Sequence, residues 1–379
     1  MEGWDSVFGF RKQCAAHEDP MRNLMLFSML TDMSQPESTQ TIAQMSADTQ
    51  PRFVRRPPSA FAQWVVAGWI YGFMLPLVRV LESAGQAERF MGAFSKRMSR
   101  NIEKNNPFRG YAPGPQDVFV MTLPKSGTNW MMQIAHQLIW HGQADYDHIH
   151  EVVPWPDTKA MPGFLRNYAI PLEEAQDWRQ SPERKRVIKT HFNWELLPYS
   201  DQARYIAVIR DPKDVFVSSY FFVRDGLYGP AMPSVDTWYR MFISGKGMMG
   251  MSWPENTAGY WAQRQRPNVL ILSFKSMKKD LVGTVRRVAE FLDIRVGEDV
   301  IQKVAALSSF DFMKSIDHKF HIGKVIPWRE PGAMMRKGAH GNSSELLTPE
   351  RQREVDADCL AELKRLDCDL PYEEFCTLA

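Results

Sequence analysis

A cluster of small, polar and basic residues stands between an apolar run and an amphipathic segment near position 125. Lys125 contributes an ammonium group, Ser126 and Thr128 contribute hydroxyls, Asn129 contributes an amide, and Gly127 lies among them. Where such a turn opens a helix, the first backbone N–H groups point the same way and carry partial positive charge. This arrangement is suited to binding a phosphate. It is not the Gly-Lys-Ser/Thr loop of magnesium-dependent nucleotidases, because here the lysine precedes the glycine.

Two further positions carry chemistry at the ends of later apolar runs. His191 follows Lys189 closely, and Arg210 comes before a helical stretch that contains Ser218. An imidazole titrates near neutrality, and the fixed fork of a guanidinium matches phosphate oxygens. Taken singly, His191 also fits a packed histidine, and Arg210 also fits a surface ion pair with a neighbouring aspartate. No role is assigned to the other histidines.

Composition sets limits on the function. The 379 residues include 46 Lys and Arg against 44 Asp and Glu, a net charge of +2, so the chain has no overall field that attracts nucleic acid. The four cysteines form no Cys-x-x-Cys pair and no zinc pattern, which favours reduced thiols in a cytoplasmic protein. No metal-binding motif is present, and the first 20 residues lack the continuous apolar run of a secretory signal.

The elements that must position these residues follow from the alternation of apolar runs and helical patterns. Strands are expected at residues 118–122, 186–190, 205–209 and 269–274, and helices at 128–140, 213–225, 281–294 and 299–307. Asp211 and Pro212 are suited to the N-cap and first turn of the second helix. Strands alternating with helices predict an α/β fold, a P-loop-like parallel β-sheet flanked by helices.

The N-terminal part has a different character. Residues 33–51 are rich in Ser, Thr, Gln and Pro, a composition typical of disorder, whereas residues 60–78 contain no charge. The apolar segment is long enough to span a bilayer. Three interpretations stay open: a spanning helix, an interfacial helix anchored by Trp64 and Trp69, and a helix packed on the catalytic domain. The expected domains are an extension over 1–58, a helical segment over 59–104 and a catalytic domain over 105–379.

Four segments, taken in order, resemble those of the cytosolic-type sulfotransferase family. LPKSGTNW is similar to the family's 5′-phosphosulfate loop, KTHFNWELLP to its Lys-Thr-His segment, YIAVIRDPKDVFVSSYFF to its 3′-phosphate segment, and RKGAHG to its Arg-Lys-Gly loop. The resemblance covers residues 111–378. It implies an enzyme that moves a sulfuryl group from 3′-phosphoadenosine-5′-phosphosulfate (PAPS) to a hydroxyl or amine, without a metal ion.

The resemblance also implies roles for individual residues. His191 would take the proton of the acceptor, with Lys189 and Lys125 stabilising charge at the reacting group. The residues implied to bind PAPS are Lys125, Ser126, Gly127, Thr128, Asn129, Trp130, Arg210, Ser218, Phe274, Phe310, Arg336, Lys337 and Gly338. Among them, Trp130 and Phe310 would sandwich the adenine, and Phe274 stands where the family usually has a tyrosine.

The acceptor side is less closely determined. Trp155, Phe164, Phe192 and Trp194 are candidate lining residues, each of which also fits core packing, and their aromatic character favours a phenol, sterol or other hydrophobic alcohol as small-molecule acceptor. The segment after Gly341 departs from the family's pattern, so the family's usual dimer is not assumed. Other hypotheses are a P-loop small-molecule kinase, a nucleotide-binding module without catalysis, and a membrane-associated sulfotransferase that contacts a membrane through residues 60–78 and acts on glycans or lipids.

Overall fold

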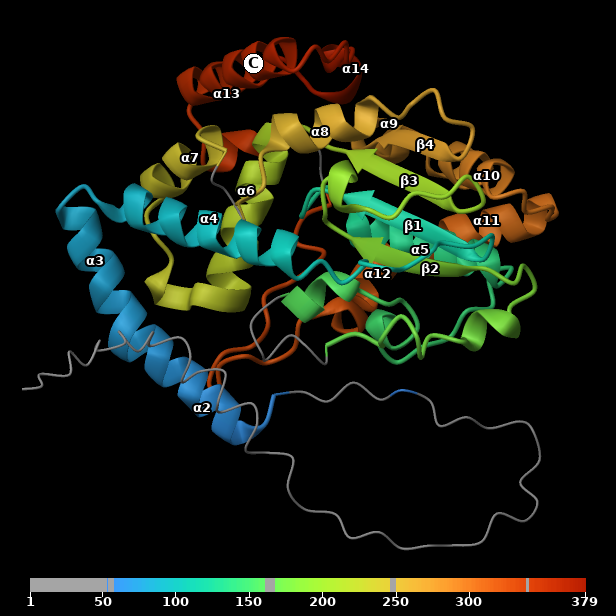
Figure 1. Cartoon of the computed structure of the whole chain (residues 1–379), viewed down its shortest axis with the longest axis horizontal. Coiled ribbons are helices and arrows are strands. Elements are labelled where there is room, and N and C mark those ends of the chain that lie inside the picture. The colour runs from blue at the N-terminus through green and yellow to red at the C-terminus, as the bar shows by residue number, and fades with distance from the viewer. Residues whose placement is uncertain (1–52, 54–57, 161–167, 246–249, 339–340) are drawn as a thin grey trace, which may run out of the picture. The chain divides into compact units, whose positions relative to one another are not determined.

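A computed structural model describes residue 53 and residues 58–160, 168–245, 250–338 and 341–379. Its centre is a parallel sheet of four strands in the order β2-β1-β3-β4 (Figure 1). The register places Phe119 of β1 opposite Ile188 of β2 on one side and Tyr205 of β3 on the other. The strands are β1 (Asp117–Thr122), β2 (Arg186–Thr190), β3 (Arg204–Ile209) and β4 (Val269–Ser273).

All four strands are largely buried, including the polar ends of β2, as expected for a sheet covered on both faces. The four predicted strands are confirmed, although β1 and β3 each begin one residue earlier than expected and β4 ends one residue earlier. Phe274 begins helix α9 instead of ending β4, because the chain leaves the extended conformation at Ser273, the N-cap of that helix.

Helices pack against both faces of the sheet. On one face α5, α10 and α11 bury Ile134, Val285 and Val304 against β1 and its neighbours, and on the other Phe119 and Tyr205 pack with segments from the rest of the chain. The α-helices of the catalytic part are α5 (Thr128–Ile139), α6 (Pro212–Val223), α7 (Val235–Ile243), α8 (Trp253–Trp261), α9 (Phe274–Lys279), α10 (Leu281–Phe291), α11 (Glu298–Leu307), α12 (Phe310–Ser315), α13 (Pro349–Arg365) and α14 (Tyr372–Phe375).

Short 3₁₀ and π segments connect these elements. They are η2 (Ile149–Glu151), η3 (Pro156–Ala160), η5 (Asp177–Arg179), η6 (Trp194–Leu196), η7 (Arg224–Tyr228), η8 (Gly229–Ala231), η10 (Asp317–Phe320) and η11 (Ser343–Glu345). The π segment η7 directly continues α6, so the helix predicted at 213–225 runs on into a wider turn. The other three predicted helices are present, and each matches its expected bound at one end and differs from it by one to three residues at the other.

The apolar segment near residue 60 is helical from Ala60 to Ser83 and, by length and composition, could cross a membrane. It comprises α2 (Ala60–Gly68), the π segment η1 (Trp69–Met74) and α3 (Leu75–Ser83), and α4 (Ala87–Lys104) follows. One side of this helix is buried against Ala231 and Ile326 of the catalytic part. Of the three interpretations left open by the sequence, this contact supports packing on the catalytic domain, and it leaves the opposite side of the helix exposed.

Candidate active site

The turn between β1 and α5 has the geometry of an anion-binding loop. Lys125 and Gly127 adopt positive φ values of 71° and 103°, and a Cβ at Gly127 would lie 2.9 Å from the ring of Phe274, so only glycine fits there. The turn places the start of α5, whose first N–H groups lack partners within the helix, at the carboxyl edge of the sheet. The Ser126 hydroxyl is buried and has no hydrogen-bond partner among the described residues. Of the turn residues predicted to bind phosphate, Ser126 does not line the cavity at this edge of the sheet.

One cavity of about 340 Å³ opens at this edge of the sheet. Because the strands are parallel, the residues that follow β1, β2 and β3 all reach the same edge, which is where open α/β sheets bind ligands. The predicted site residues that line the cavity are Lys125, Gly127, Thr128, Asn129, Trp130, Trp155, Lys189, His191, Arg210, Ser218, Phe274, Phe310, Arg336, Lys337 and Gly338. Segments separated by more than two hundred residues thus meet in one site.

His191 is held in a defined tautomer. Its Nδ1 lies 2.8 Å from the carbonyl oxygen of Thr122, and since a carbonyl only accepts, Nδ1 carries the proton and Nε2 is left as a proton acceptor. The backbone N–H of His191 donates to the buried carboxylate of Asp157 over 2.7 Å. The ring is therefore held at Nδ1 and the backbone of the same residue at its N–H, and His191 lines the cavity.

Three neighbouring groups have strongly shifted pKa values. Burial, assisted by the charges of Lys189 and Lys125, lowers the pKa of His191 to about 3. Without a bound anion the imidazole is therefore neutral at pH 7, and the expectation that it titrates near neutrality is wrong for this state. Burial also lowers the pKa of Lys189 to about 7, and Lys125 adds to this shift while Asp157 opposes it. For Lys125, burial together with Arg210 and Arg336 lowers the pKa to about 8. Accumulated positive charge with little solvent around it indicates a site built for an anion.

Arg210 joins the phosphate-binding turn to a second cationic region. Its Nη1 donates to the carbonyl oxygen of Lys125 over 2.9 Å, and the guanidinium lies 4.4 Å from the ring centroid of Phe274. Its Nη2 lies 3.8 Å from the Asp214 carboxylate, and this is the ion pair that the sequence left open as an alternative role. Arg210 therefore forms this ion pair and also lines the cavity.

Asp214 also holds the loop that carries the remaining cations. Its two carboxylate oxygens accept the backbone N–H groups of Gly341 and Asn342 over 3.1 and 3.0 Å. Arg336 and Lys337 then reach the cavity from this loop, where both pair with Glu345 at 2.8 and 2.9 Å. A bound phosphate would compete with Glu345 for the same two cations.

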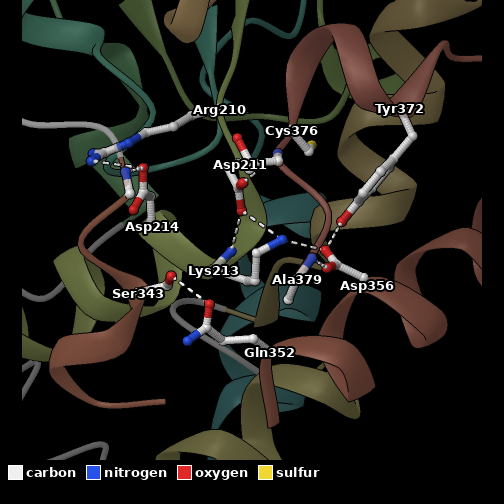
Figure 2. Close-up of polar contacts among 12 residues, drawn as sticks. Arg210, Asp211, Lys213, Asp214, Ser343, Gln352, Asp356, Tyr372, Cys376 and Ala379 are labelled. Atoms are coloured by element: carbon white, nitrogen blue, oxygen red, sulfur yellow. Dashed lines mark hydrogen bonds and ion pairs between the residues drawn. The ribbon is translucent and has the colours of Figure 1, made fainter. Parts of the chain in front are cut away.

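A buried network anchors the start of α6, immediately after Arg210 (Figure 2). The Lys213 ammonium lies between the carboxylates of Asp211 and Asp356, and Tyr372 donates to Asp356 over 2.7 Å. Burial opposes the charge of Lys213, but the two carboxylates outweigh it and raise its pKa. Asp211 also caps α6 through the Lys213 N–H, as its sequence position predicted. Through this network α13 and the C-terminal segment fix the helix that follows Arg210.

Aromatic rings form the wall of the cavity near these cations. The indole of Trp130 is fixed by a 2.7 Å hydrogen bond to the Ser308 carbonyl and packs edge-on against Phe274 at 5.4 Å. Phe310 lies against Gly338, where φ is +56° and a Cβ would come within 1.9 Å of the ring. The Arg-Lys-Gly loop can therefore approach Phe310 only because position 338 is glycine.

The predicted acceptor residues are only partly brought together. Trp155 lines the cavity, and Phe164 lies outside the described residues. The lining role expected of Phe192 and Trp194 needs correction, because both pack with Tyr205 in the core on the other face of the sheet. The backbone after β2 still alternates, so His191 faces the cavity while Phe192 faces away from it.

Several residues of the site were missed by the sequence reasoning. His150 and Tyr168 line the cavity, and the Nε2 of His150 lies 3.4 Å from the Lys189 ammonium. Lys189 also lies 3.4 Å from the ring centroid of Trp155. Asp157, which binds the backbone of His191, follows Trp155 in the sequence WPD, and a carboxylate beside a predicted aromatic lining residue was the one available signal.

The carboxyl edge of this parallel sheet combines an anion-binding turn, an oriented imidazole and a cation-lined cavity. These features together are typical of a group-transfer enzyme with an anionic substrate. Residues 115–367 match the family model described as "Sulfotransferase domain", and the chain belongs to the sulfotransferase family. It is therefore an enzyme of this class, and its fold is the P-loop-like parallel sheet that the sequence predicted.

Curated relatives and solved structures agree with this assignment. Human "Sulfotransferase 1C2" is 26% identical over 266 residues, which cover 67% of this chain and 86% of the relative. "Luciferin sulfotransferase" of Photinus pyralis is 31% identical over 252 residues, covering 60% and 66%. A retinol dehydratase, crystallised "in complex with androsterone and inactive cofactor PAP", has a TM-score of 0.57 at 21% identity and covers 73% of this chain and 88% of its own; it shows a shared fold.

Proposed function

We propose that this sulfotransferase uses PAPS as its sulfuryl donor and transfers the sulfuryl group to a small hydrophobic acceptor. The observation that carries the proposal is the single cavity in which the Lys125 turn, Arg210 and His191 meet. The hydrogen bond from Arg210 to the Lys125 carbonyl makes the two cationic regions adjacent, as the two phosphate groups of one nucleotide require.

The donor would be bound along the wall of the cavity. Lys125 and the turn residues Ser126, Gly127, Thr128 and Asn129 would hold the 5′-phosphosulfate, since the turn offers N–H groups, hydroxyls and an ammonium. Trp130 and Phe310, with Phe274 beside them, would contact the adenine. The 3′-phosphate would be held by Arg210, Ser218, Arg336, Lys337 and Gly338.

In the reaction His191 would act as the general base. Its Nε2 would take the proton of the acceptor hydroxyl while the acceptor oxygen forms a bond to sulfur and the bond from sulfur to the 5′-phosphate oxygen breaks. Lys125 and Lys189 would neutralise the charge that develops on the leaving phosphate and the transferred group. The negative charge of the donor would offset the two lysines and raise the pKa of His191 from its low value. We expect no metal ion to be needed, because the lysines supply this charge.

The acceptor side of the cavity is aromatic and apolar. Trp155, Tyr168 and Ile322 pack together there, close to His191, whose ring lies 5.5 Å from that of Trp155. Such a wall suits a phenol, sterol, other alcohol or amine better than a polysaccharide. The names of relatives point the same way, since they include "Luciferin sulfotransferase" and "Amine sulfotransferase".

We assign this chemistry to a catalytic domain at residues 105–379, preceded by the helical segment 59–104 and the extension 1–58. The location we propose is the cytoplasm, in keeping with three free cysteines among the described residues. A membrane contact through residues 60–78 would leave the chemistry unchanged, because none of these residues lines the cavity.

Calorimetry with adenosine 3′,5′-bisphosphate, combined with turnover of PAPS and a panel of phenols, sterols and amines, tests the proposal. His191→Ala should abolish turnover while binding the bisphosphate almost normally. Arg210→Ala should weaken binding of the bisphosphate but not of adenosine 5′-monophosphate, which lacks the 3′-phosphate. A wild-type protein that fails to bind the bisphosphate, or an active His191→Ala variant, would contradict the assignment.

A further inference from the structure

The helix that precedes the catalytic part exposes a continuous apolar stripe. Its large side chains recur at helical spacing on one side, with exposed fractions between 42% and 67%. Among residues 60–78, every exposed residue is apolar or a glycine. Single exposed apolar residues are ordinary, but a contiguous stripe marks a contact surface. This outer face consists of Phe61, Trp64, Val65, Trp69 and Phe73.

The inner side of the same helix is attached to the catalytic part. Ile70 and Met74 are buried against Ala231 and Ile326. Beyond them, the Glu82 carboxylate accepts hydrogen bonds from Ser234 N–H and the Thr237 hydroxyl over 2.6 and 3.1 Å. These contacts would be lost if the helix crossed a bilayer. The helix instead stays attached to the catalytic part and leaves its outer face exposed for contact with a partner.

The chemistry of the outer face indicates which partner this is. Protein interfaces usually carry a polar rim and about one hydrogen bond per 100–200 Å², whereas the only side-chain polar groups of this stripe are the indole N–H groups of Trp64 and Trp69. Tryptophan and phenylalanine beside basic residues are typical of helices that lie in the interface of an anionic membrane. Arg52, Arg55 and Arg56 precede the stripe in sequence, Arg79 follows it, and no acidic residue lies between residues 53 and 81.

We propose that the outer face of α2 and η1 binds the surface of an anionic membrane and that the acceptor enters the active site from that membrane. Trp328 extends the face, with its ring 5.2 Å from that of Trp64. The segment that carries Ile326 and Trp328 has its ends in the cavity, at Ile322 and Met334. Ile322 packs against the aromatic acceptor wall.

A hydrophobic alcohol or phenol dissolved in the bilayer would therefore lie beside the segment between Ile322 and Met334, both of which line the cavity. This inference rests on the proposed function, in that the cavity must take a hydrophobic acceptor. It narrows the acceptor class to hydroxyl compounds that partition into lipid.

Vesicle flotation of the full chain tests the membrane contact. The protein should float with vesicles of phosphatidylcholine and phosphatidylglycerol and much less with phosphatidylcholine alone. A triple variant, Trp64→Ser, Trp69→Ser and Phe73→Ser, should bind the anionic vesicles more than about tenfold more weakly, because it loses most of the apolar area. The matched control is Leu360→Ser, which removes an exposed apolar side chain on α13 and should leave flotation unchanged.

Activity separates this inference from the proposed function. With a water-soluble phenol and no lipid, the triple variant should turn over like wild type; with a sterol supplied in anionic vesicles, it should lose most of its rate. A full chain that does not float, or a triple variant that floats equally well, would overturn the membrane contact. So would a lipid-free dimer that the triple variant abolishes, because the face would then bind a second copy. If wild type and all variants fail to turn over the phenol, that result would count against the proposed function alone.

Discussion

Donor binding should take up protons, because the anion site contains lysines that are only weakly basic in the free protein. Burial and the nearby arginines lower the pKa of Lys125 to about 8. A bound bisphosphate would stabilise the ammonium form and return this pKa toward its usual value. Between pH 7 and pH 9 the free protein loses the Lys125 proton while the complex keeps it. Affinity should therefore fall as the pH rises.

The size of the effect follows from the shift. With a pKa of about 8, roughly one Lys125 in eleven is protonated at pH 9, so affinity should be about tenfold weaker at pH 9 than at pH 7, or about 1.4 kcal/mol. Lys189, with its pKa lowered to about 7, would add to the loss. The phosphates of the ligand do not contribute, because their second pKa is about 6.

Isothermal titration with adenosine 3′,5′-bisphosphate in buffers of different ionisation enthalpy measures both affinity and proton uptake. Wild type should take up close to one proton more per nucleotide at pH 9 than Lys125→Arg, since an arginine stays charged throughout. Lys104→Arg, on helix α4 outside the cavity, is the control and should behave like wild type. Equal affinity at pH 7 and pH 9, with no proton uptake, would refute a Lys125 held next to the bound phosphates.

Two further variants test how the site is positioned. Gly338→Ala would place a Cβ 1.9 Å from Phe310 and should weaken bisphosphate binding by about 1–3 kcal/mol, the usual contribution of base stacking. Gly341→Ala has a similarly positive φ but open space around it, so equal losses in calorimetry would show that backbone strain, not the Phe310 contact, is responsible. Asp157→Ala leaves the His191 N–H without its acceptor and should lower kcat with little change in KM, at a cost of about 1–3 kcal/mol. Asp157→Asn keeps an acceptor oxygen and should restore most of the rate; if both variants lose activity equally, the charge matters and the hydrogen bond does not.

Much of the fold could be predicted because it depends on local patterns. The four strands are short runs rich in β-branched and apolar residues, and Asp211 and Pro212 mark the start of α6 as an N-cap and first-turn pair should. The end of β4 was missed by one residue, since Ser273 is the N-cap position of α9 and nothing in the apolar run itself shows where the backbone turns. The roles of the site residues remain predictions, although most of these residues lie in one cavity.

The sequence by itself determined the strand-to-helix turn with its anion-binding residue types, the parallel α/β class and the set of candidate basic residues, because each depends on residue types within a short stretch. Only the tertiary structure decided that His191 faces the cavity while Phe192 faces the core, and that His150 and Asp157 join the site from other segments. It also decided that one side of the helix that begins at Ala60 packs against the catalytic part while the other side is exposed. Burial, pKa shifts and the facing of a side chain depend on groups far away in the chain, and no local pattern contains them.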